Sequence, residues 1–285
     1  MKLVMTLLVR NSEELLRSNL EFHLGQGVDF FIITDNGSVD GTADIIGDYV
    51  RAGLAEMILE PDDTYSQGRW VTRMARLAAT RHGADWVINS DDDEFWFARH
   101  SDLKQGFVQL PAATVAIEAT RRNHPPLRGP SGLGALNAMI YRESSSFTPL
   151  LTPLPPKVAH RAMADVEVAQ GNHAIARDGV PLPAAPTDAI EISHFPVRGY
   201  PAFARKIELG GAAYARNTEL DPEVGLTWRW LHELLNRNRL RDWYDQQLLA
   251  PDQAMQRLED GSLVIDEFVA RALDKLPDAK CANAV

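Results

Sequence analysis

The stretch that decides the fold covers residues 86–95 and reads Trp86-Val87-Ile88-Asn89-Ser90-Asp91-Asp92-Asp93-Glu94-Phe95. An apolar run typical of a buried strand leads directly into consecutive acids, and more apolar residues follow. Packed carboxylates repel each other, and burial increases that repulsion. A bound divalent cation offsets it, and hard oxygen ligands suit Mg²⁺ or Mn²⁺. In an extended segment Asp91 and Asp93 point the same way, so we expect them to share one metal site. A solvated acidic turn is the alternative.

The residues before this stretch alternate strand and helix patterns. Apolar runs predict strands at 2–9, 30–34, 55–60 and 86–89. Helices are predicted between them at 42–51, at 69–81 and after Asn11, which would cap its helix with Glu14 as the capping-box partner. This alternation predicts an α/β fold with a mostly parallel sheet flanked by helices. Ligands bind such sheets beyond the carboxyl ends of the strands, which is where Asp35 and the acidic run stand.

The later half of the sequence is less regular. Residues 121–156 are rich in Pro, Gly, Ser and Arg and predict a long loop or an excursion over the sheet. A loop of this length is uncommon in a compact domain unless it is a lid or a binding loop. Short strands are predicted at 114–119, 167–170 and 189–193, and a mostly helical segment follows. We therefore expect a catalytic domain over residues 1–200 and a helical C-terminal extension over 201–285.

Bulk properties exclude several classes of protein. The chain has 285 residues, is 45% hydrophobic and carries a net charge of −10, so it should repel nucleic acid. The single cysteine, Cys281, allows no disulfide within the chain, which favours a reducing compartment. The apolar start predicts a buried strand rather than a signal peptide, and no run is long enough for a membrane span. We expect a cytoplasmic protein and leave open a peripheral association with the membrane through a partner.

Three motifs follow one another along the chain: Val9-Arg10-Asn11, Thr34-Asp35-Asn36-Gly37-Ser38-Val39-Asp40-Gly41-Thr42, and Asp91-Asp92-Asp93-Glu94-Phe95. In this order they resemble the family-two inverting glycosyltransferases of GT-A fold, in particular the bacterial branch with a D-x-D-E-F motif. The resemblance covers about the first hundred residues. It implies a GT-A-type sheet, a nucleotide-diphosphate sugar donor, commonly a UDP-sugar, and Mn²⁺ or Mg²⁺ as cofactor.

The resemblance also implies roles for single residues. Asp35 would accept hydrogen bonds from the base, and Asn11 would also bind the nucleotide. Asp91 would bind the ribose or the metal, and Asp93 the metal. The alternative for Asp35 is a plain turn residue.

A histidine late in the sequence, as related enzymes often supply to the metal, would be His194. Arg198 and Lys206 would meet the diphosphate. A satisfied strand-end histidine and two exposed cations are the alternative. Arg73, on a helix face with Arg69, could also reach a phosphate or simply solvate the helix.

An inverting transfer needs a general base for the acceptor hydroxyl. Asp165 and Glu167 are the first choices, and Glu118 is the reserve. The turn Gly171-Asn172-His173 could contact donor or acceptor, although a structural role explains it equally well.

The sequence thus predicts a metal-dependent, hexosyltransferase-like enzyme acting on an unidentified glycan or small-molecule acceptor. One alternative is a nucleotide-sugar-binding partner subunit without turnover. A sugar nucleotidyltransferase is disfavoured, because no glycine-rich phosphate loop follows the first strand.

Overall fold

The structure is a computed structural model that describes residues 1–64, 66–128 and 136–276. The chain divides into two compact units, of which the first comprises residues 1–121 and 155–192 and the second residues 122–154 and 193–285. The second unit therefore includes the helical segment expected from residue 201, and it also takes in part of the region expected to be a loop. Cys281 and residues 129–135 of that loop lie outside the described residues.

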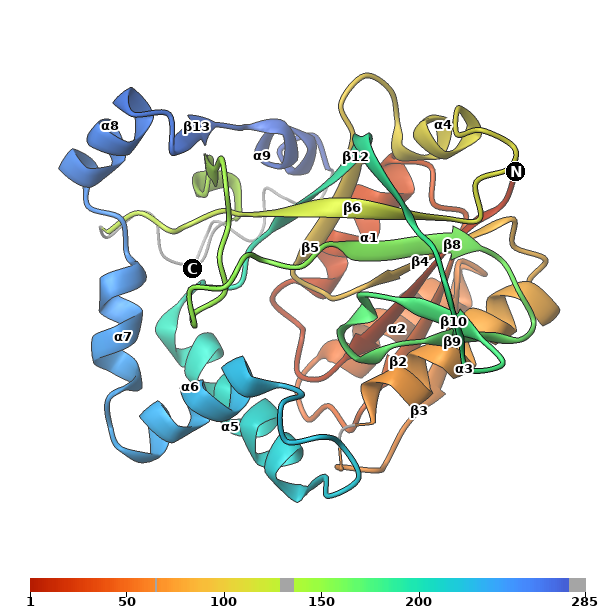
Figure 1. Cartoon of the computed structure of the whole chain (residues 1–285), viewed down its shortest axis with the longest axis horizontal. Helices are drawn as coiled ribbons and strands as arrows, with labels where there is room; N and C mark the ends of the chain where they lie inside the picture. The colour runs from red at the N-terminus through yellow and green to blue at the C-terminus, as the bar shows by residue number, and fades with distance from the viewer. Residues whose placement is uncertain (65, 129–135, 277–285) are drawn as a thin grey trace. The chain divides into compact units, whose positions relative to one another are not determined.

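The first unit is built on an eight-stranded sheet of order β3-β2-β1-β4-β8-β6-β12-β5 (Figure 1). The strands are β1 Leu3–Val9, β2 Phe30–Asp35, β3 Ala55–Leu59, β4 Trp86–Ser90, β5 Glu94–Ala98, β6 Ala116–Asn123, β8 Lys157–Arg161 and β12 Ala185–His194. β3, β2, β1 and β4 pair in parallel, whereas β8 is antiparallel to both β4 and β6. The expected α/β class is confirmed, and the parallel half of the sheet is the half that the alternating pattern predicted.

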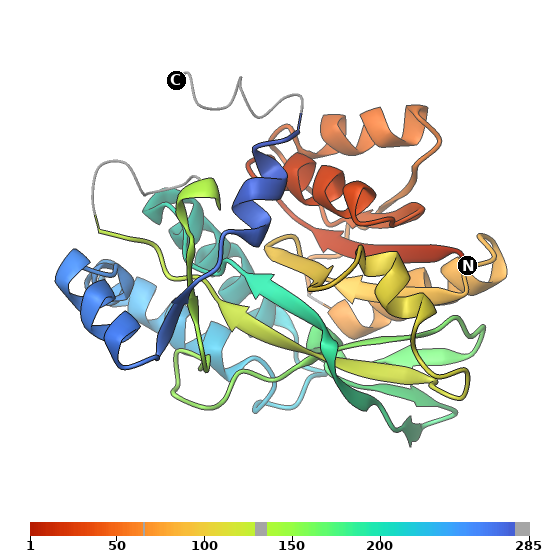
Figure 2. The same cartoon turned by 90° about the horizontal axis from the view of Figure 1, so that it is seen from above.

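Helices cover both faces of the parallel half (Figure 2). They are α1 Leu16–Gly25, α2 Thr42–Arg51 and α3 Gln67–Thr80, with α4 Leu103–Val108 following β5. On one face Leu16, Leu20 and Ile46 pack in a core with alternate residues of β1. On the other face Val71 and Met74 of α3 pack with Val4 and Val87. β1 is therefore buried on both faces, as its unbroken apolar run predicted.

A small three-stranded antiparallel sheet, of order β11-β10-β9, follows β8. It consists of β9 Val166–Val168, β10 Ile175–Arg177 and β11 Val180–Leu182, and the short helix η2 Gln170–Asn172 lies between β9 and β10. Val166 and Val168 are buried in the same core as α3.

The second unit is mostly helical. Its elements are η1 Leu136–Ala138, β7 Tyr141–Glu143, α5 Tyr200–Arg216, α6 Leu226–Asn236, α7 Leu240–Gln247, α8 Pro251–Glu259, β13 Leu263–Ile265 and α9 Phe268–Leu273. β7 and β13 pair as a two-stranded antiparallel sheet. Within the described residues, no helix is both long and apolar enough to cross a membrane.

Two local expectations are wrong. α1 begins at Leu16, and Asn11 has a positive φ of 54° rather than a capping conformation. Its side chain is used elsewhere, because Asn11 Oδ1 accepts a hydrogen bond from the Val39 N–H at 2.8 Å. The acidic run is a tight turn rather than an extended segment, since the Glu94 N–H donates to the Asp91 carbonyl at 3.2 Å. Strand alternation therefore does not apply to Asp91 and Asp93.

Candidate active site

The acidic turn joins β4 to β5 at the carboxyl end of β4. Helix α1 holds it in place, because the Asn19 Nδ2 donates to the carbonyls of Asp92 and Glu94 at 3.0 and 2.9 Å. The Ser12 hydroxyl also donates to Asp92 Oδ2 at 2.6 Å. These bonds come from a segment about 75 residues earlier in the chain, so the main chain of the turn is fixed by tertiary structure.

Two cations meet the acids of this turn. Lys157 Nζ lies 2.6 Å from Asp91 Oδ2 and 3.2 Å from Glu94 Oε1. Arg121 Nη1 lies 3.0 Å from the same Glu94 oxygen. The side chains of Glu94 and Lys157 are 0% and 1% exposed, whereas Asp91 is 31% exposed. Asp91 is thus the member of this ionic network that a ligand can reach.

Burial raises the pKa of Glu94, and the neighbouring charges of Asp91 and Asp93 act in the same direction. Lys157 and Arg121 oppose this rise by stabilising the carboxylate. Sequence reasoning missed both cations. The available signal was Lys157 itself, a lone lysine at the start of the apolar run Val158-Ala159.

The structure does not assemble a divalent-cation site from the predicted ligands. No group of three or more His, Cys, Asp or Glu side chains within the described ranges is placed to hold a metal ion. Asp91 already faces the ammonium of Lys157, and Asp93 is only 2% exposed. The described acidic turn, arranged in this way, does not fit a hard divalent cation, which needs several oxygen ligands.

The Asp35 turn lies at the end of β2, next to β1. Asp35 is 3% exposed, and its Oδ1 accepts hydrogen bonds from the Ser38 N–H at 3.0 Å and from the Ser38 hydroxyl at 2.5 Å. The Asn11 N–H in turn donates to Ser38 Oγ at 2.9 Å. Asn11 and Asp35 are therefore brought together, and both have structural partners. Their binding to a nucleotide stays a prediction.

A ladder of hydrogen bonds joins α3 to the segment 165–171. Arg76 Nε donates to the Val166 carbonyl at 2.7 Å, and the Val168 N–H donates to Thr72 Oγ1 at 2.8 Å. At the other end of α3, the Gly171 N–H donates to Gln67 Oε1 at 3.1 Å. Gln67 Nε2 also approaches Asp91 Oδ1 at 3.3 Å. The end of the ladder at Gln67 is therefore the end that adjoins the acidic turn.

The two predicted bases lie further along this ladder. Asp165 pairs with Arg177 at 3.0 Å, and its side chain is 50% exposed. Glu167 lies between Val166 and Val168, whose side chains are buried against α3, so its own side chain points away from that helix. Glu118, the reserve, lies on β6 in register with Val158. The structure brings neither Asp165 nor Glu167 to Asp91.

His173 does lie near the acidic turn. Its Nδ1 is 2.7 Å from the carbonyl oxygen of Pro156, the residue before Lys157. Burial, together with the charges of Lys157 and Arg121, lowers the pKa of His173 to about 4, although the hydrogen bond to Pro156 and the charge of Asp91 oppose the shift. The imidazole is therefore neutral at pH 7 and shares the electrostatic surroundings of the network.

The other predicted phosphate and metal residues have partners of their own. Arg73, in the first unit, pairs with Glu60 at 3.0 Å. His194, Arg198 and Lys206 belong to the second unit. There His194 Nδ1 lies 2.8 Å from Asn123 Oδ1, and Arg198 Nη1 donates to the Phe195 carbonyl at 2.9 Å. Lys206 Nζ lies 5.8 Å from the centre of the Trp228 ring. Their roles toward a ligand stay predictions.

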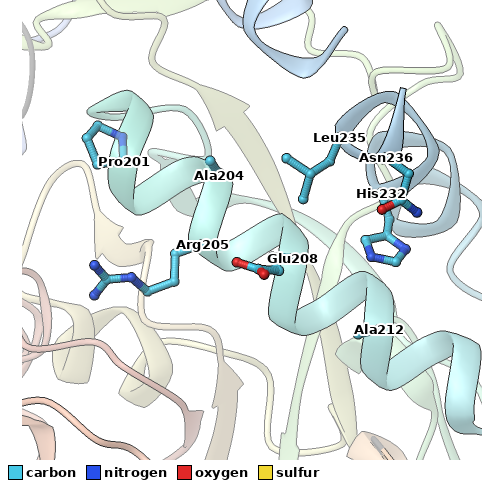
Figure 3. Close-up of a pocket in the computed structure, with 8 residues that line it drawn as sticks. All are labelled: Pro201, Ala204, Arg205, Glu208, Ala212, His232, Leu235 and Asn236. Atoms are coloured by element: carbon cyan, nitrogen blue, oxygen red, sulfur yellow. The ribbon is translucent and has the colours of Figure 1, made fainter. Parts of the chain in front are cut away.

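The second unit also contains a pocket of about 540 Å³ between α5 and α6 (Figure 3). It is lined by Pro201, Ala204, Arg205, Glu208, Ala212, His232, Leu235 and Asn236. It shares no lining residue with the acidic turn, and the sequence assigned no role to these residues.

No protein-family model and no curated protein matches the sequence. Among solved structures, the chain is similar to S. aureus TarS residues 1–349, at 12% identity and a TM-score of 0.41, over 99% of this chain and 92% of that one. The same protein in complex with UDP-GlcNAc gives 12% identity and a TM-score of 0.44, over 93% and 97% of the two chains. Glucosyl-3-phosphoglycerate synthase from Mycobacterium tuberculosis, in complex with Mn²⁺, UDP and glucosyl-3-phosphoglycerate, gives 20% identity and a TM-score of 0.31, over 42% and 44%. These values describe a likeness in general architecture only.

Proposed function

We propose that the chain is a glycosyltransferase that takes a nucleotide-diphosphate sugar, with UDP as the nucleotide, and transfers the sugar with inversion to an acceptor hydroxyl. The observation that carries this proposal is the convergence of the Asp35 turn and the acidic turn at the carboxyl ends of β2 and β4, which flank β1. Parallel sheets bind ligands at this edge. The order of the two motifs in the sequence supports the same conclusion.

Charge at this edge suits a diphosphate leaving group. Breaking the bond between sugar and phosphate leaves negative charge on the diphosphate, and fixed positive charge stabilises it. Lys157, paired with Asp91 and Glu94, and Arg121, paired with Glu94, supply two buried cations at the acidic turn. Because they lie in surroundings of low dielectric constant, their field is screened less than that of surface lysines. Asp91, the exposed acid, would then contact the ribose.

Metal dependence is tested separately from the transfer itself, because the acidic turn as described does not fit a divalent cation. The motif resemblance implies Mn²⁺ or Mg²⁺ at Asp91 and Asp93, with His194 as a further ligand. As described, Asp91 is paired with Lys157, so a cation would have to displace that ammonium. Calorimetric titration of UDP, once with Mn²⁺ and once with EDTA, separates the cases. A Kd that is tenfold or more lower with Mn²⁺ would support the metal, and equal values would count against it.

The proposal is tested by measuring UDP release from a panel of UDP-sugars, with water or added acceptors as nucleophile. A transferase releases UDP, whereas a partner subunit that only binds nucleotide sugars releases none. The matched variant is Asp35→Asn, which keeps an oxygen for the Ser38 turn and removes the charge. We expect this variant to bind UDP at least tenfold more weakly, while Asp44→Asn, exposed on α2, binds normally. Unchanged UDP affinity in Asp35→Asn would make Asp35 a turn residue only.

A further inference from the structure

His173 has one ring nitrogen fixed and the other open. A carbonyl oxygen can only accept, so the Pro156 carbonyl requires a hydrogen on Nδ1. In the neutral imidazole this leaves a lone pair on Nε2. Among the described residues no group bonds to Nε2, and this atom is not one of the buried polar atoms that lack a partner. The Nε2 lone pair is therefore available to a ligand.

Position separates His173 from the two acids that the sequence favoured as bases. Asp165 is at the Arg76 end of the ladder, where Arg76 Nη2 approaches its carbonyl at 3.4 Å. A helix rises about 1.5 Å per residue, so the Gln67 and Arg76 ends are roughly 14 Å apart. A general base must lie within about 3 Å of the hydroxyl whose proton it takes. An acid at the Arg76 end of α3 is therefore too far from a substrate bound at the Gln67 end. His173 lies two residues after Gly171, whose N–H donates a hydrogen bond to Gln67 at the end of α3 that adjoins the acidic turn.

The groups around His173 favour a neutral, oriented imidazole. The positive charges of Lys157 and Arg121 favour the neutral imidazole, and the negative charge of Asp91 opposes them. Gly171 has a φ of 78°, and a Cβ on it would lie 2.7 Å from His173 Nε2. The turn is therefore shaped closely around the ring, and the ring cannot rotate away freely while Pro156 holds Nδ1.

We propose that His173 is the general base of the transfer, which rests on the function proposed above. The oxygen of the acceptor hydroxyl attacks the anomeric carbon, and its proton moves to His173 Nε2. The bond from the anomeric carbon to the diphosphate oxygen breaks, and its electron pair leaves with the diphosphate. The imidazolium then releases its proton to water. No redox partner is needed, and charge and atoms balance.

The matching test uses UDP-glucose and UDP-GlcNAc as donors and water as nucleophile, so it needs no identified acceptor. His173→Asn keeps a side-chain donor for the Pro156 carbonyl and removes the base. We expect at least a hundredfold slower UDP release with a UDP Kd within threefold of the parent. His173→Gly should regain at least tenfold in rate on addition of imidazole, which a purely structural histidine would not show. His82→Asn, on a histidine paired with Glu56, is the matched control and should keep the parent rate.

Three results are distinguishable. If the parent chain neither binds UDP nor releases it from either donor, the proposed function fails, and the assignment of His173 fails with it. If the parent is active and His173→Asn releases UDP at the parent rate, the base assignment alone is overturned. Loss of release in Asp165→Asn or Glu167→Gln, with His173→Asn unaffected, would return the role to one of these two acids.

Discussion

Glu94 is the acid of the turn that pairs with both buried cations. It is fully buried and faces both Lys157 and Arg121. Removing one partner of a buried ion pair leaves charge without compensation, typically at a loss of about 3–5 kcal/mol. We therefore predict that Glu94→Gln lowers the free energy of unfolding by about 3 kcal/mol or more in urea titrations.

A suitable control for Glu94→Gln is Asp48→Asn. Asp48 also pairs with two arginines, Arg17 and Arg51, but its side chain is 47% exposed. Exposed ion pairs contribute little to stability, so the control should leave the free energy of unfolding nearly unchanged. Equal losses in the two variants would mean that water reaches the Glu94 network.

At the residue scale, the sequence predicts the acids of the site better than the cations. Asp35 and the acidic run stand beside strand and turn signals that can be recognised locally. Lys157 meets Asp91 across 66 residues of sequence, and Arg121 meets Glu94 across 27. Such pairings arise only when β6 and β8 join the sheet, so no local pattern predicts them. Glu167 suits a general base by residue type, but the direction of its side chain on β9 depends on packing that no local pattern predicts.

The turn from Gln170 to His173 is the element that places the proposed base. Gly171 has a φ of 78°, and a Cβ on it would lie 2.6 Å from the His173 ring. Gly171→Ala should therefore displace the imidazole and reduce UDP release at least tenfold, in addition to a destabilisation of about 1–3 kcal/mol from the strained φ. Thermal unfolding and UDP release measured on the same preparation test both effects.

Gly179 provides the comparison for that substitution. Its φ is 74°, nearly the same, but a Cβ there meets nothing within 4 Å. Gly179→Ala should show the backbone strain alone, with UDP release unchanged. If both alanine variants lose release equally, the effect comes from backbone strain and not from contact with His173.

Elements with a strong local pattern were predicted well, including the short strands β3 and β4, whereas the short strands β7 and β13 were not. α2 has the expected bounds, Thr42–Arg51, because its apolar stripe and its flanking glycines agree. β13 has three residues and pairs with β7, so the mostly helical pattern expected from residue 201 onward did not indicate it. The start of α1 was misplaced because Asn11 is used by the Asp35 turn.

At the scale of the whole molecule, the order of elements along the chain does not predict which stretches make up each of the two units. Each unit is assembled from two separate stretches, so a single boundary near residue 200 cannot describe them. The parallel half of the sheet follows from alternating strands and helices. The antiparallel half does not, because β8, β6 and β12 are joined by long connections whose pairing depends on burial rather than on local pattern.

Buried neutral histidines are expected to make the folded state less stable at acidic pH. Burial lowers the pKa of His23 to about 3, and those of His124 and His160 to about 4. His23 is held neutral by geometry as well, since its Nε2 accepts the Trp96 N–H at 3.0 Å. In the unfolded chain each histidine titrates near 6.5, so the unfolded state binds more protons below that pH.

Stability should therefore be complete above about pH 6.5 and fall as the pH drops toward 4. Between pH 7 and pH 5 each such histidine should remove about 2 kcal/mol from the free energy of unfolding. Urea titrations at pH 7, 6 and 5 give the slope, and His160→Leu should reduce the pH 7-to-5 loss by about 2 kcal/mol, whatever its effect at pH 7. The slope is the decisive quantity, because lost packing shifts all three values alike. A slope that is the same in His160→Leu and in the parent chain would show that folding does not lower the pKa of His160.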